Sequence, residues 1–232
     1  MAATDTFLLH GAIGDGRQIA PLAERLTDSG VGRPVLVELP GHGTTPLGSC
    51  DFSIDGFARF VLAELDRRGV AQADFFGFSM GGYVALHLAA IAPARVHRVA
   101  TLGTKLAWSP DVAARESAML DAATIRAKVP KFAAVLEQRH TALGWEVLLT
   151  RTAELLAELG ARPSLTSEVL ATIEQPVRIA VGDRDATVSI AECADAVRAL
   201  RSGQLEVHPA TPHPIEKAPL DRVARSLAEF FA

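Results

Sequence analysis

The stretch 77–81, with the sequence GFSMG, decides the fold, because it reads G-x-S-x-G between an apolar run and a helix former. Residues 73–76 (ADFF) suit a buried strand, and residues 82–90 (GYVALHLAA) favour a helix. Strand, sharp turn and helix are the context in which this pattern exposes a serine nucleophile at a sheet edge. We therefore expect Ser79 in a strained turn, with flanking glycines allowing close backbone approach. The alternative is a glycine-rich turn whose serine only caps the helix.

The composition of the chain indicates one globular α/β domain. The chain has 232 residues, of which 49% are hydrophobic and 22% charged, so a full core can form. The net charge of −4 argues against a nucleic-acid or anionic-membrane partner. No apolar stretch approaches a membrane span, and no signal peptide is visible. Two cysteines, Cys50 and Cys193, favour a reduced, cytoplasmic protein over a disulfide framework.

Short apolar runs alternate with helical patterns along most of the chain. This alternation predicts a mostly parallel sheet with helices on both faces. About six strands are expected, at residues 6–10, 34–39, 73–76, 96–103, 177–182 and 204–208. Helices are expected at residues 19–26, 54–65, 82–90, 190–201 and 217–231.

One long segment interrupts the alternation, because residues 105–175 contain no convincing strand. The segment instead holds helical stretches at residues 112–120, 125–142, 146–158 and 167–173. Ligands bind beyond the carboxyl ends of the strands in open α/β sheets, where such an insertion would lie. We therefore predict a core domain of residues 1–104 and 176–232, with residues 105–175 forming a helical cap.

A serine nucleophile needs an acid that orients its base, and the acid is expected after a later strand. Two carboxylates follow the strand at residues 177–182, and Asp185 is favoured over Asp183 because it lies further beyond the strand end. Either aspartate could instead serve only the turn, since Asp bonds readily to nearby backbone.

The base is expected in the loop after the last strand. His213 lies there between two prolines, which fix the backbone on both sides of the imidazole. His208 is the weaker candidate, because it lies within or at the edge of the strand. The chain order Ser79, Asp185, His213 is the one that hydrolases with this elbow use.

An oxyanion hole requires two backbone N–H groups. One is expected from Met80, the residue after the nucleophile, and the other from Ala12, in the loop HGAIG (residues 10–14) after the first strand. Gly11 would permit the close turn. His10 is expected to form structural hydrogen bonds rather than act as a base.

Together these residues resemble the α/β-hydrolase superfamily, in particular its small capped serine esterases. The resemblance spans nearly the whole chain and rests on the HG, PGHG, GFSMGG and GDRD sequences and the last-loop histidine, at residues 10–11, 40–43, 77–82, 182–185 and 213. The biotin-pathway carboxylesterases and the menaquinone-pathway synthases are among the similar members. In this family the acid usually stands third after the strand-ending glycine, which also points to Asp185.

Three features depart from the family pattern. The chain begins near the family's third strand, so we expect about six strands rather than eight, without the N-terminal hairpin. Pro212 stands where a glycine usually precedes the catalytic histidine. Residues 106–108 and the rest of the expected cap match no substrate-specific pattern.

The resemblance implies hydrolysis of a carboxylic ester through an acyl-enzyme on Ser79, with no cofactor and no metal ion. The expected partner is a small, partly apolar ester, and the expected state is a monomer or homodimer. The alternatives are elimination or C–C hydrolysis with the same three residues, a weakly catalytic ligand-binding protein, and peptidase or peroxide chemistry. A basic cluster facing Ser79 would favour elimination, and a sealed cleft would favour binding alone.

Several apolar residues of the expected cap are candidates to contact the substrate. The predicted substrate-binding residues are Trp108, Phe132, Leu136 and Trp145, with Met119 and Leu149 as further candidates. Apolar residues at helical spacing also suit the cap's own packing. Four basic residues of this segment could contact an acidic substrate, but the solvated surface is the favoured expectation for them; they are Arg126, Lys128, Arg139 and His140.

Overall fold

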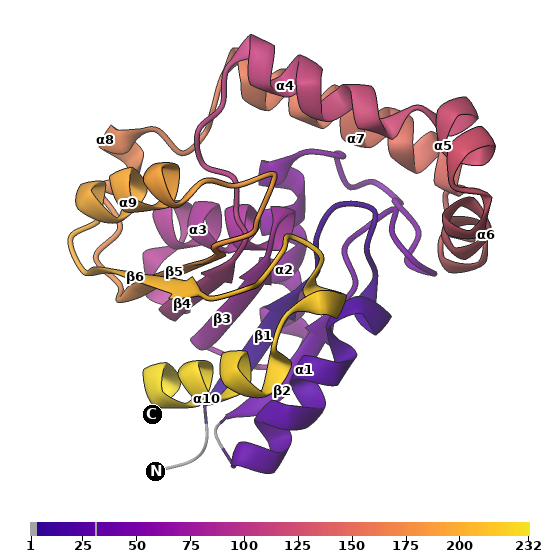
Figure 1. Ribbon diagram of the computed structural model, residues 1–232. Helices are drawn as coiled ribbons and strands as arrows, with labels where there is room; N and C mark the ends of the chain where they lie inside the picture. Colours follow the sequence, from indigo (N-terminus) through magenta and orange to yellow (C-terminus); the bar gives the residue numbers. More distant parts are fainter. Residues whose placement is uncertain (1–3, 31) are drawn as a thin grey trace.

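A six-stranded parallel sheet forms the centre of the computed structural model, which describes residues 4–30 and 32–232 (Figure 1). Its strands are β1 (Asp5–Leu9), β2 (Arg33–Val37), β3 (Ala73–Phe78), β4 (Val96–Leu102), β5 (Val177–Gly182) and β6 (Gly203–His208). Their order is β2-β1-β3-β4-β5-β6, and each neighbouring pair is parallel. The predicted six-stranded parallel sheet is therefore confirmed. The strand order reverses between β1 and β3, where open α/β sheets bind ligands.

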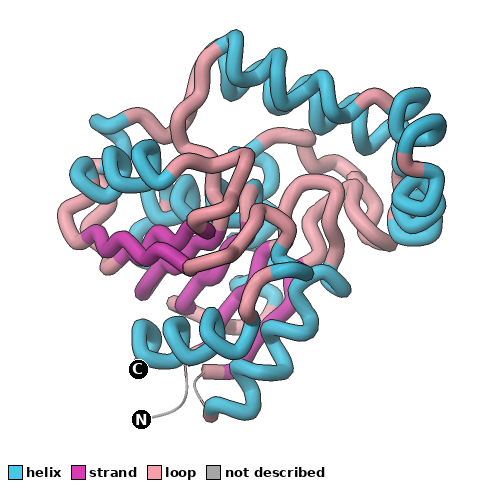
Figure 2. The backbone as a smooth tube through the Cα atoms, in the orientation of Figure 1, coloured by secondary structure: helices cyan, strands magenta, loops and turns pink. Residues whose placement is uncertain are grey.

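Helices cover both faces of this sheet (Figure 2). On one face lie α1 (Gly16–Ser29) and α10 (Leu220–Phe231), and on the other α2 (Ile54–Arg67), α3 (Met80–Ile91) and α9 (Ile190–Ala199). Short 3-10 turns η1 (Pro93–Arg95) and η3 (Ile215–Lys217) complete the core.

The two apolar layers follow from the period of two along each strand. Phe7 belongs to the cluster under α2 and α3, whereas Leu8 belongs to the cluster under α1 and α10. Phe75 and Phe76 divide in the same way. Each fully buried side chain of this size contributes about 1.5–3 kcal/mol, so both layers stabilise the sheet.

A helical insertion connects β4 to β5. It contains α4 (Pro110–Ser117), η2 (Ala118–Leu120), α5 (Ala122–Lys128), α6 (Pro130–Arg139), α7 (Trp145–Ala161) and α8 (Ser167–Leu170). α4 packs along α7, and both cross the space above the carboxyl ends of the strands (Figure 1). The division into core and cap stays a prediction, and residues 1–3 and 31 of that predicted core lie outside the described residues.

The insertion corrects one sequence-based expectation. Residues 125–142 were expected to form one helical stretch, but α5 ends at Lys128 and α6 begins at Pro130. Val129 between them has φ −136° and ψ 61°, outside the helical region. The residue before a proline disfavours the helical conformation, and proline suits the first helical position, so the break was visible in the sequence.

Candidate active site

Ser79 lies on a sharp turn between β3 and α3, with φ 51° and ψ −118°. Such a φ is costly for a residue with a side chain, so the surroundings must hold it. The Ser79 N–H donates to the Leu102 carbonyl at 2.9 Å, and the Ser79 carbonyl accepts from Thr104 Oγ1 at 3.0 Å. The end of β4 therefore fixes the turn from both sides.

The glycines around Ser79 are required by backbone approach, as predicted. A Cβ on Gly77 would overlap the backbone of Gly82, and a Cβ on Gly81 would overlap the carbonyl of Leu9. Both obstacles are backbone atoms, which cannot turn aside. The GFSMG sequence thus brings β3, α3 and the end of β1 close together.

His213 and Asp185 come together at the carboxyl edge of the sheet. His213 Nδ1 lies 2.8 Å from Asp185 Oδ2, and Asp185 Oδ1 accepts from the N–H groups of Thr187 and Val188 at 2.8 Å each. Burial raises the pKa of Asp185, but the His213 ring and the amides outweigh it, so this pKa lies below the ordinary value. The ionised carboxylate accepts, so Nδ1 donates and Nε2 is left as the acceptor.

Asp183 and His208, the competing candidates for the acid and the base, make other contacts. Asp183 Oδ1 accepts from the Thr211 N–H at 3.2 Å, which is the turn role that the sequence suggested for one of the two aspartates. His208 is buried on β6 beside Glu206.

Gly103, at φ 63°, lies against the Asp185–His213 pair. A Cβ added to Gly103 would approach both Asp185 Oδ2 and His213 Nδ1 to 3.3 Å. The strand-ending position of Gly103 was visible in the sequence, but its neighbours were not.

The loop after β1 holds a fixed peptide group beside Ser79. The Gly11 carbonyl, which shares its peptide plane with the Ala12 N–H, accepts from His10 Nδ1 at 2.8 Å and from the Gly14 N–H at 3.1 Å. His10 Nε2 accepts from the Leu39 N–H at 3.0 Å, which fixes the tautomer. Burial lowers the pKa of His10 to about 4, so the ring is neutral. His10 is therefore the structural hydrogen-bonding residue that the sequence suggested.

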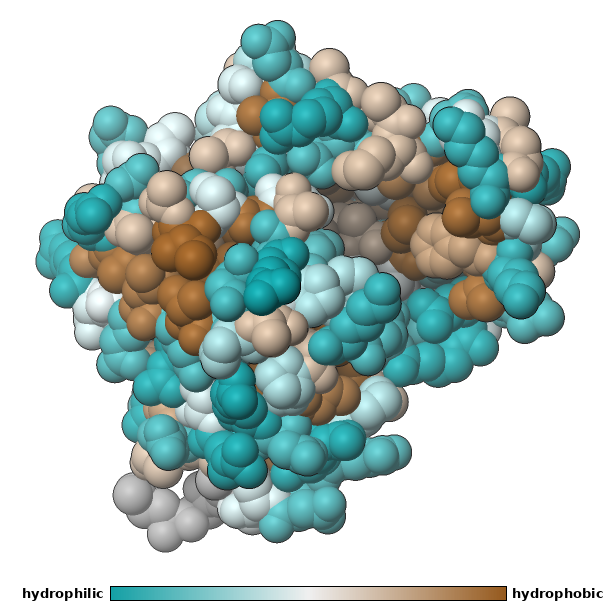
Figure 3. Space-filling model, in the orientation of Figure 1, coloured by the Kyte–Doolittle hydropathy of each residue, from teal (hydrophilic) through white to brown (hydrophobic). Residues whose placement is uncertain are grey.

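A cleft of about 350 Å³ separates the core from the insertion, and it is visible as a hollow in Figure 3. From the core, Ala12, Ser79, Met80 and His213 line it. From the insertion, Trp108 and Phe132 line it, as does Met119. Most of the other lining side chains are apolar, including Ile13, Ile54, Phe78, Leu120, Leu155, Leu156 and Leu159.

Two predicted substrate-binding residues do not line this cleft. Leu136 and Trp145 pack with Ile125, Ala133 and Leu149 inside the insertion, where Leu136 is 1% and Trp145 5% exposed. The Arg126 guanidinium also lies 5.0 Å from the centre of the Trp145 ring. Burying an aromatic ring between α5, α6 and α7 stabilises the insertion, and helical spacing alone does not separate that role from substrate contact.

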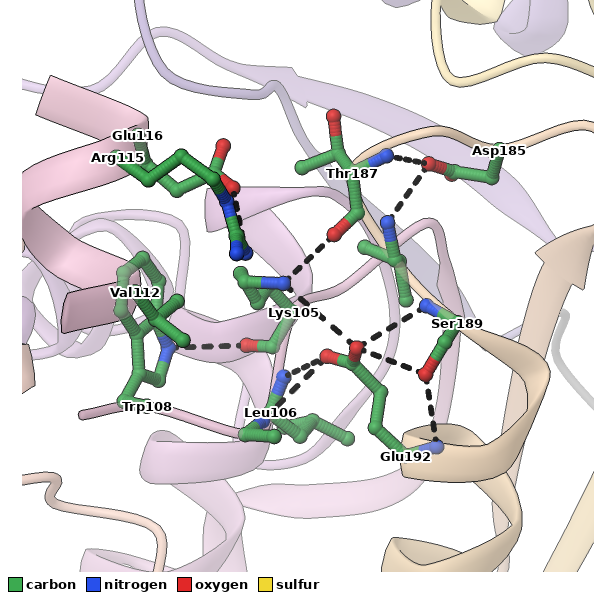
Figure 4. A network of polar contacts seen from close by, with 12 residues as sticks. Lys105, Leu106, Trp108, Val112, Arg115, Glu116, Asp185, Thr187, Ser189 and Glu192 are labelled. Atoms are coloured by element: carbon green, nitrogen blue, oxygen red, sulfur yellow. Dashed lines mark hydrogen bonds and ion pairs between the residues drawn. The ribbon is translucent and has the colours of Figure 1, made fainter. Parts of the chain in front are cut away.

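A buried polar network joins the start of the insertion to the loop of Asp185 (Figure 4). Lys105 Nζ donates to the Thr187 carbonyl at 2.6 Å and lies 3.6 Å from Glu192 Oε2. Glu192 Oε1 accepts from the N–H groups of Leu106 at 3.1 Å and Ala107 at 3.4 Å. The Lys105 and Glu192 side chains are 9% and 10% exposed. Lys105 and Glu192 therefore attach the first residues of the insertion to the loop that carries Asp185.

Sequence reasoning missed this network. Ser189 and Glu192 form a capping box at the start of α9, with the Glu192 N–H donating to Ser189 Oγ at 3.1 Å, and that S-x-x-E signal was readable. It marks a helix start, however, and does not show that the same carboxylate meets Lys105. Among the described residues, no group of three or more His, Cys, Asp and Glu side chains could hold a metal ion.

Comparison with known proteins adds to this geometry. A family model described as alpha/beta hydrolase fold matches residues 7–195. The acetyltransferase component of the acetoin cleaving system from Pseudomonas putida is 37% identical over 98 residues, which are 40% of this chain and 25% of that protein. A pimeloyl-[acyl-carrier protein] methyl ester esterase from Neisseria meningitidis is 38% identical over 96 residues, which are 41% of this chain and 34% of the esterase. The matches thus span about a quarter to a third of these relatives.

Solved structures extend the likeness over the whole chain. The enol-lactonase from Burkholderia xenovorans has a TM-score of 0.78 at 21% identity, over 99% of this chain and 92% of that one. A serine hydrolase from Cycloclasticus zankles has a TM-score of 0.80 at 18% identity, over 98% and 89% of the two chains. At such identity the likeness is one of fold. No helix within the described residues is long and apolar enough to cross a membrane.

Proposed function

Because the chain belongs to the α/β hydrolase fold family, we propose that it is a serine hydrolase that cleaves a carboxylic ester. The observation that carries the proposal is the 2.8 Å contact of His213 Nδ1 with Asp185, because His213 also lines the cleft that Ser79 lines. The name of the Neisseria esterase supports ester chemistry in a relative that shares part of this chain.

In the proposed mechanism each of the three residues has a distinct role. His213 Nε2 takes the proton of Ser79 as Oγ attacks the ester carbonyl, and then gives it to the leaving alcohol. Asp185 keeps Nδ1 protonated and stabilises the imidazolium that forms. Water then attacks the acyl-enzyme with His213 as base, and the carboxylic acid leaves Ser79 free.

The backbone of two loops stabilises the charge that develops on the ester oxygen. The N–H groups of Ala12 and Met80 are the proposed donors, and both residues line the cleft with Ser79. The hydrogen bonds from His10 and Gly14 to the Gly11 carbonyl hold the Ala12 amide in its orientation before substrate arrives. Fixed dipoles of this kind need no reorganisation during the reaction.

We further propose that residues 105–175 act as a cap that sets the substrate class. Trp108, Met119 and Phe132 line the cleft from this segment, which suits a small ester with an apolar portion. The proposed location is the cytoplasm, a suggestion that rests on the free thiols of Cys50 and Cys193.

The charges in the cleft favour ester hydrolysis over elimination from an anionic substrate. Lys105 and Arg139 line the cleft, but so do Glu116 and Glu216. Lys105 also lies beside Glu192. The cationic cluster that an anionic substrate would need is therefore balanced by carboxylates. The hollow beside the insertion in Figure 3 likewise does not suit a sealed binding protein.

The test is hydrolysis of p-nitrophenyl esters from acetate to dodecanoate by the wild-type protein and by Ser79→Ala. Turnover that is lost in Ser79→Ala is the expected result, and the preferred chain length would size the apolar part of the cleft. Absence of Ser79-dependent turnover on every ester would reject the proposal in favour of elimination or ligand binding.

A further inference from the structure

His140, at the end of α6, bridges two loops of the core. Its Nδ1 accepts from the Gly43 N–H at 2.9 Å, and its Nε2 lies 2.9 Å from the Ile13 carbonyl. Because an N–H must donate to Nδ1 and a carbonyl must accept from Nε2, only the neutral Nε2–H tautomer satisfies both contacts. His140 is 1% exposed, which corrects the expectation that it lies at the solvated surface.

Ile13 belongs to the loop that holds the proposed oxyanion donor. It follows Ala12 directly, inside the turn closed by the hydrogen bond from the Gly14 N–H to the Gly11 carbonyl. Its φ is 51°, a costly value for a β-branched residue. A turn with this strain persists only where its surroundings stabilise it. The hydrogen bond from the His140 ring to the Ile13 carbonyl stabilises this turn.

We propose that His140 is a positioning residue: it reaches from the insertion to fix the oxyanion loop, so the hole is complete only when the insertion is seated on the core. The inference rests on the proposed hydrolase function. With His140 in this position, the insertion would influence the catalytic rate as well as the choice of substrate. The same ring fixes the Gly43 amide, so the loops after β1 and β2 are tied to one insertion residue.

His140 is neutral because it is buried. His10 and His42 come from the core, with the His42 ring centre 4.9 Å from that of His10 and 6.1 Å from that of His140. The charged groups around His140 are Asp15 of the oxyanion loop, Glu38 after β2, Arg139 beside it, and Arg17 of α1, which bonds Asp15 and the Arg139 carbonyl. Burial lowers the pKa of His140 more than the hydrogen bond to the Ile13 carbonyl and the charges of Asp15 and Glu38 raise it.

The experiment compares wild type with His140→Ala, His140→Gln and His97→Gln. A Gln amide offers one donor and one acceptor without titrating, so it can replace both contacts. His97 is a half-exposed histidine beside Asp74 at the amino end of β4, away from the cleft, and is the control for loss of a histidine elsewhere in the protein. The readouts are kcat and KM on a p-nitrophenyl ester, and the affinity for butylboronic acid, whose tetrahedral adduct with Ser79 places an oxygen in the hole.

We expect kcat of His140→Ala to fall on the order of 10- to 100-fold with KM unchanged, because a misplaced donor costs the transition state alone. The boronic acid affinity should fall by a similar factor. His140→Gln should recover most of both, and His97→Gln should match wild type. Nitrogen-15 NMR of the wild-type His140 ring should show the neutral Nε2–H form.

Distinct results would overturn the inference. A His140→Ala enzyme with wild-type kcat, or with a change in KM alone, would reject it while leaving the hydrolase proposal intact. Equal loss in the Ala and Gln variants, both with wild-type melting temperatures, would assign the effect to ring packing. A wild-type protein without Ser79-dependent turnover would instead reject the proposed function, and this inference with it.

Discussion

At the residue scale, the proposed site depends on one of two nearby aspartates, either of which the sequence offers as the partner of His213. Asp183 and Asp185 lie two positions apart, yet Asp183 bonds the Thr211 amide and Asp185 bonds the His213 ring. The difference arises because the turn after β5 directs one carboxylate toward the backbone of the last loop and the other toward its histidine. The pair therefore offers a matched comparison.

The first prediction concerns these two carboxylates. Asp185→Asn should lower kcat on the order of 10³–10⁴-fold, because a neutral amide no longer selects the tautomer of His213 or stabilises its charged form. Asp183→Asn keeps an acceptor for the Thr211 amide and should leave kcat near wild type. The measurement is steady-state hydrolysis of p-nitrophenyl butyrate. A larger loss in Asp183→Asn than in Asp185→Asn would contradict the assignment.

The second prediction follows from the lowered pKa of His10. The unfolded chain binds a proton near pH 6.5, but the folded protein binds it only near pH 4. The unfolding free energy should therefore be at its full value above pH 6.5 and fall between pH 6.5 and 4, by up to about 3 kcal/mol from His10. Urea unfolding at pH 7 and pH 4.5 measures this loss.

The control for that measurement is His10→Asn, which removes the titrating ring. The buried rings of His42 and His140 also have lowered pKa values, so the variant should keep part of the acid sensitivity. An unchanged pH dependence in His10→Asn would show that the His10 ring contributes nothing to it.

At the element scale, the attachment of the insertion depends on a buried ion pair. Glu192 satisfies two amides at the start of the insertion and lies beside the Lys105 ammonium. Removing one partner of a buried pair leaves the other charge without compensation, which costs far more than losing a surface pair. Glu174, which pairs with Arg201 at the surface, provides the contrast.

The third prediction compares these two glutamates. Glu192→Ala should lower the unfolding free energy by about 3 kcal/mol, because it removes the carboxylate beside Lys105 and the hydrogen-bond acceptor of the Leu106 amide. Glu174→Ala should cost less than about 1 kcal/mol, since both partners are exposed. Urea unfolding curves of the two variants at neutral pH measure the difference, and equal costs would count against a structural role for the buried pair.

The fourth prediction separates two neighbours on α6. Phe132 lines the cleft and is 41% exposed, whereas Leu136 is 1% exposed and packs within the insertion. Phe132→Ala should raise KM for long-chain esters with little change in stability. Leu136→Ala should destabilise the protein by about 2–5 kcal/mol. The measurements are KM across the ester series and urea unfolding, and a KM effect confined to Leu136→Ala would reverse our assignment.

At the scale of the whole molecule, the sheet could be predicted from the sequence and the insertion's contacts could not. Apolar runs such as residues 177–182 and the GFSMG turn carry local signals of strand and elbow, so strand number and direction followed. The helices of the insertion were also predicted, although residues 125–142 were expected as one stretch despite the signal for a break at Pro130. Amphipathic spacing shows that Leu136 and Phe132 are both apolar, but not which neighbour each one meets.

The residues that the sequence did not reveal share one physical feature. Lys105, Glu192 and His140 are polar side chains that fold into low exposure at junctions between distant segments. A charged or polar residue in a sequence is on average a surface residue, so its pattern predicts solvation. Only the folded junction shows the partner of each side chain, and those partners lie between 82 and 127 positions away along the chain.

The insertion leaves the sheet after β4 and returns at β5, and these strands are neighbours. Because β4 and β5 are parallel, any substitute segment must still cross from the carboxyl end of β4 to the amino end of β5, which takes a dozen or more residues. Longer segments could be grafted there while the sheet beneath keeps its strand order. A chimera made in this way would keep the serine, histidine and aspartate but lose the ring that ties down Ile13. Designers who exchange this segment to obtain new substrates should therefore transplant a bridging side chain with it.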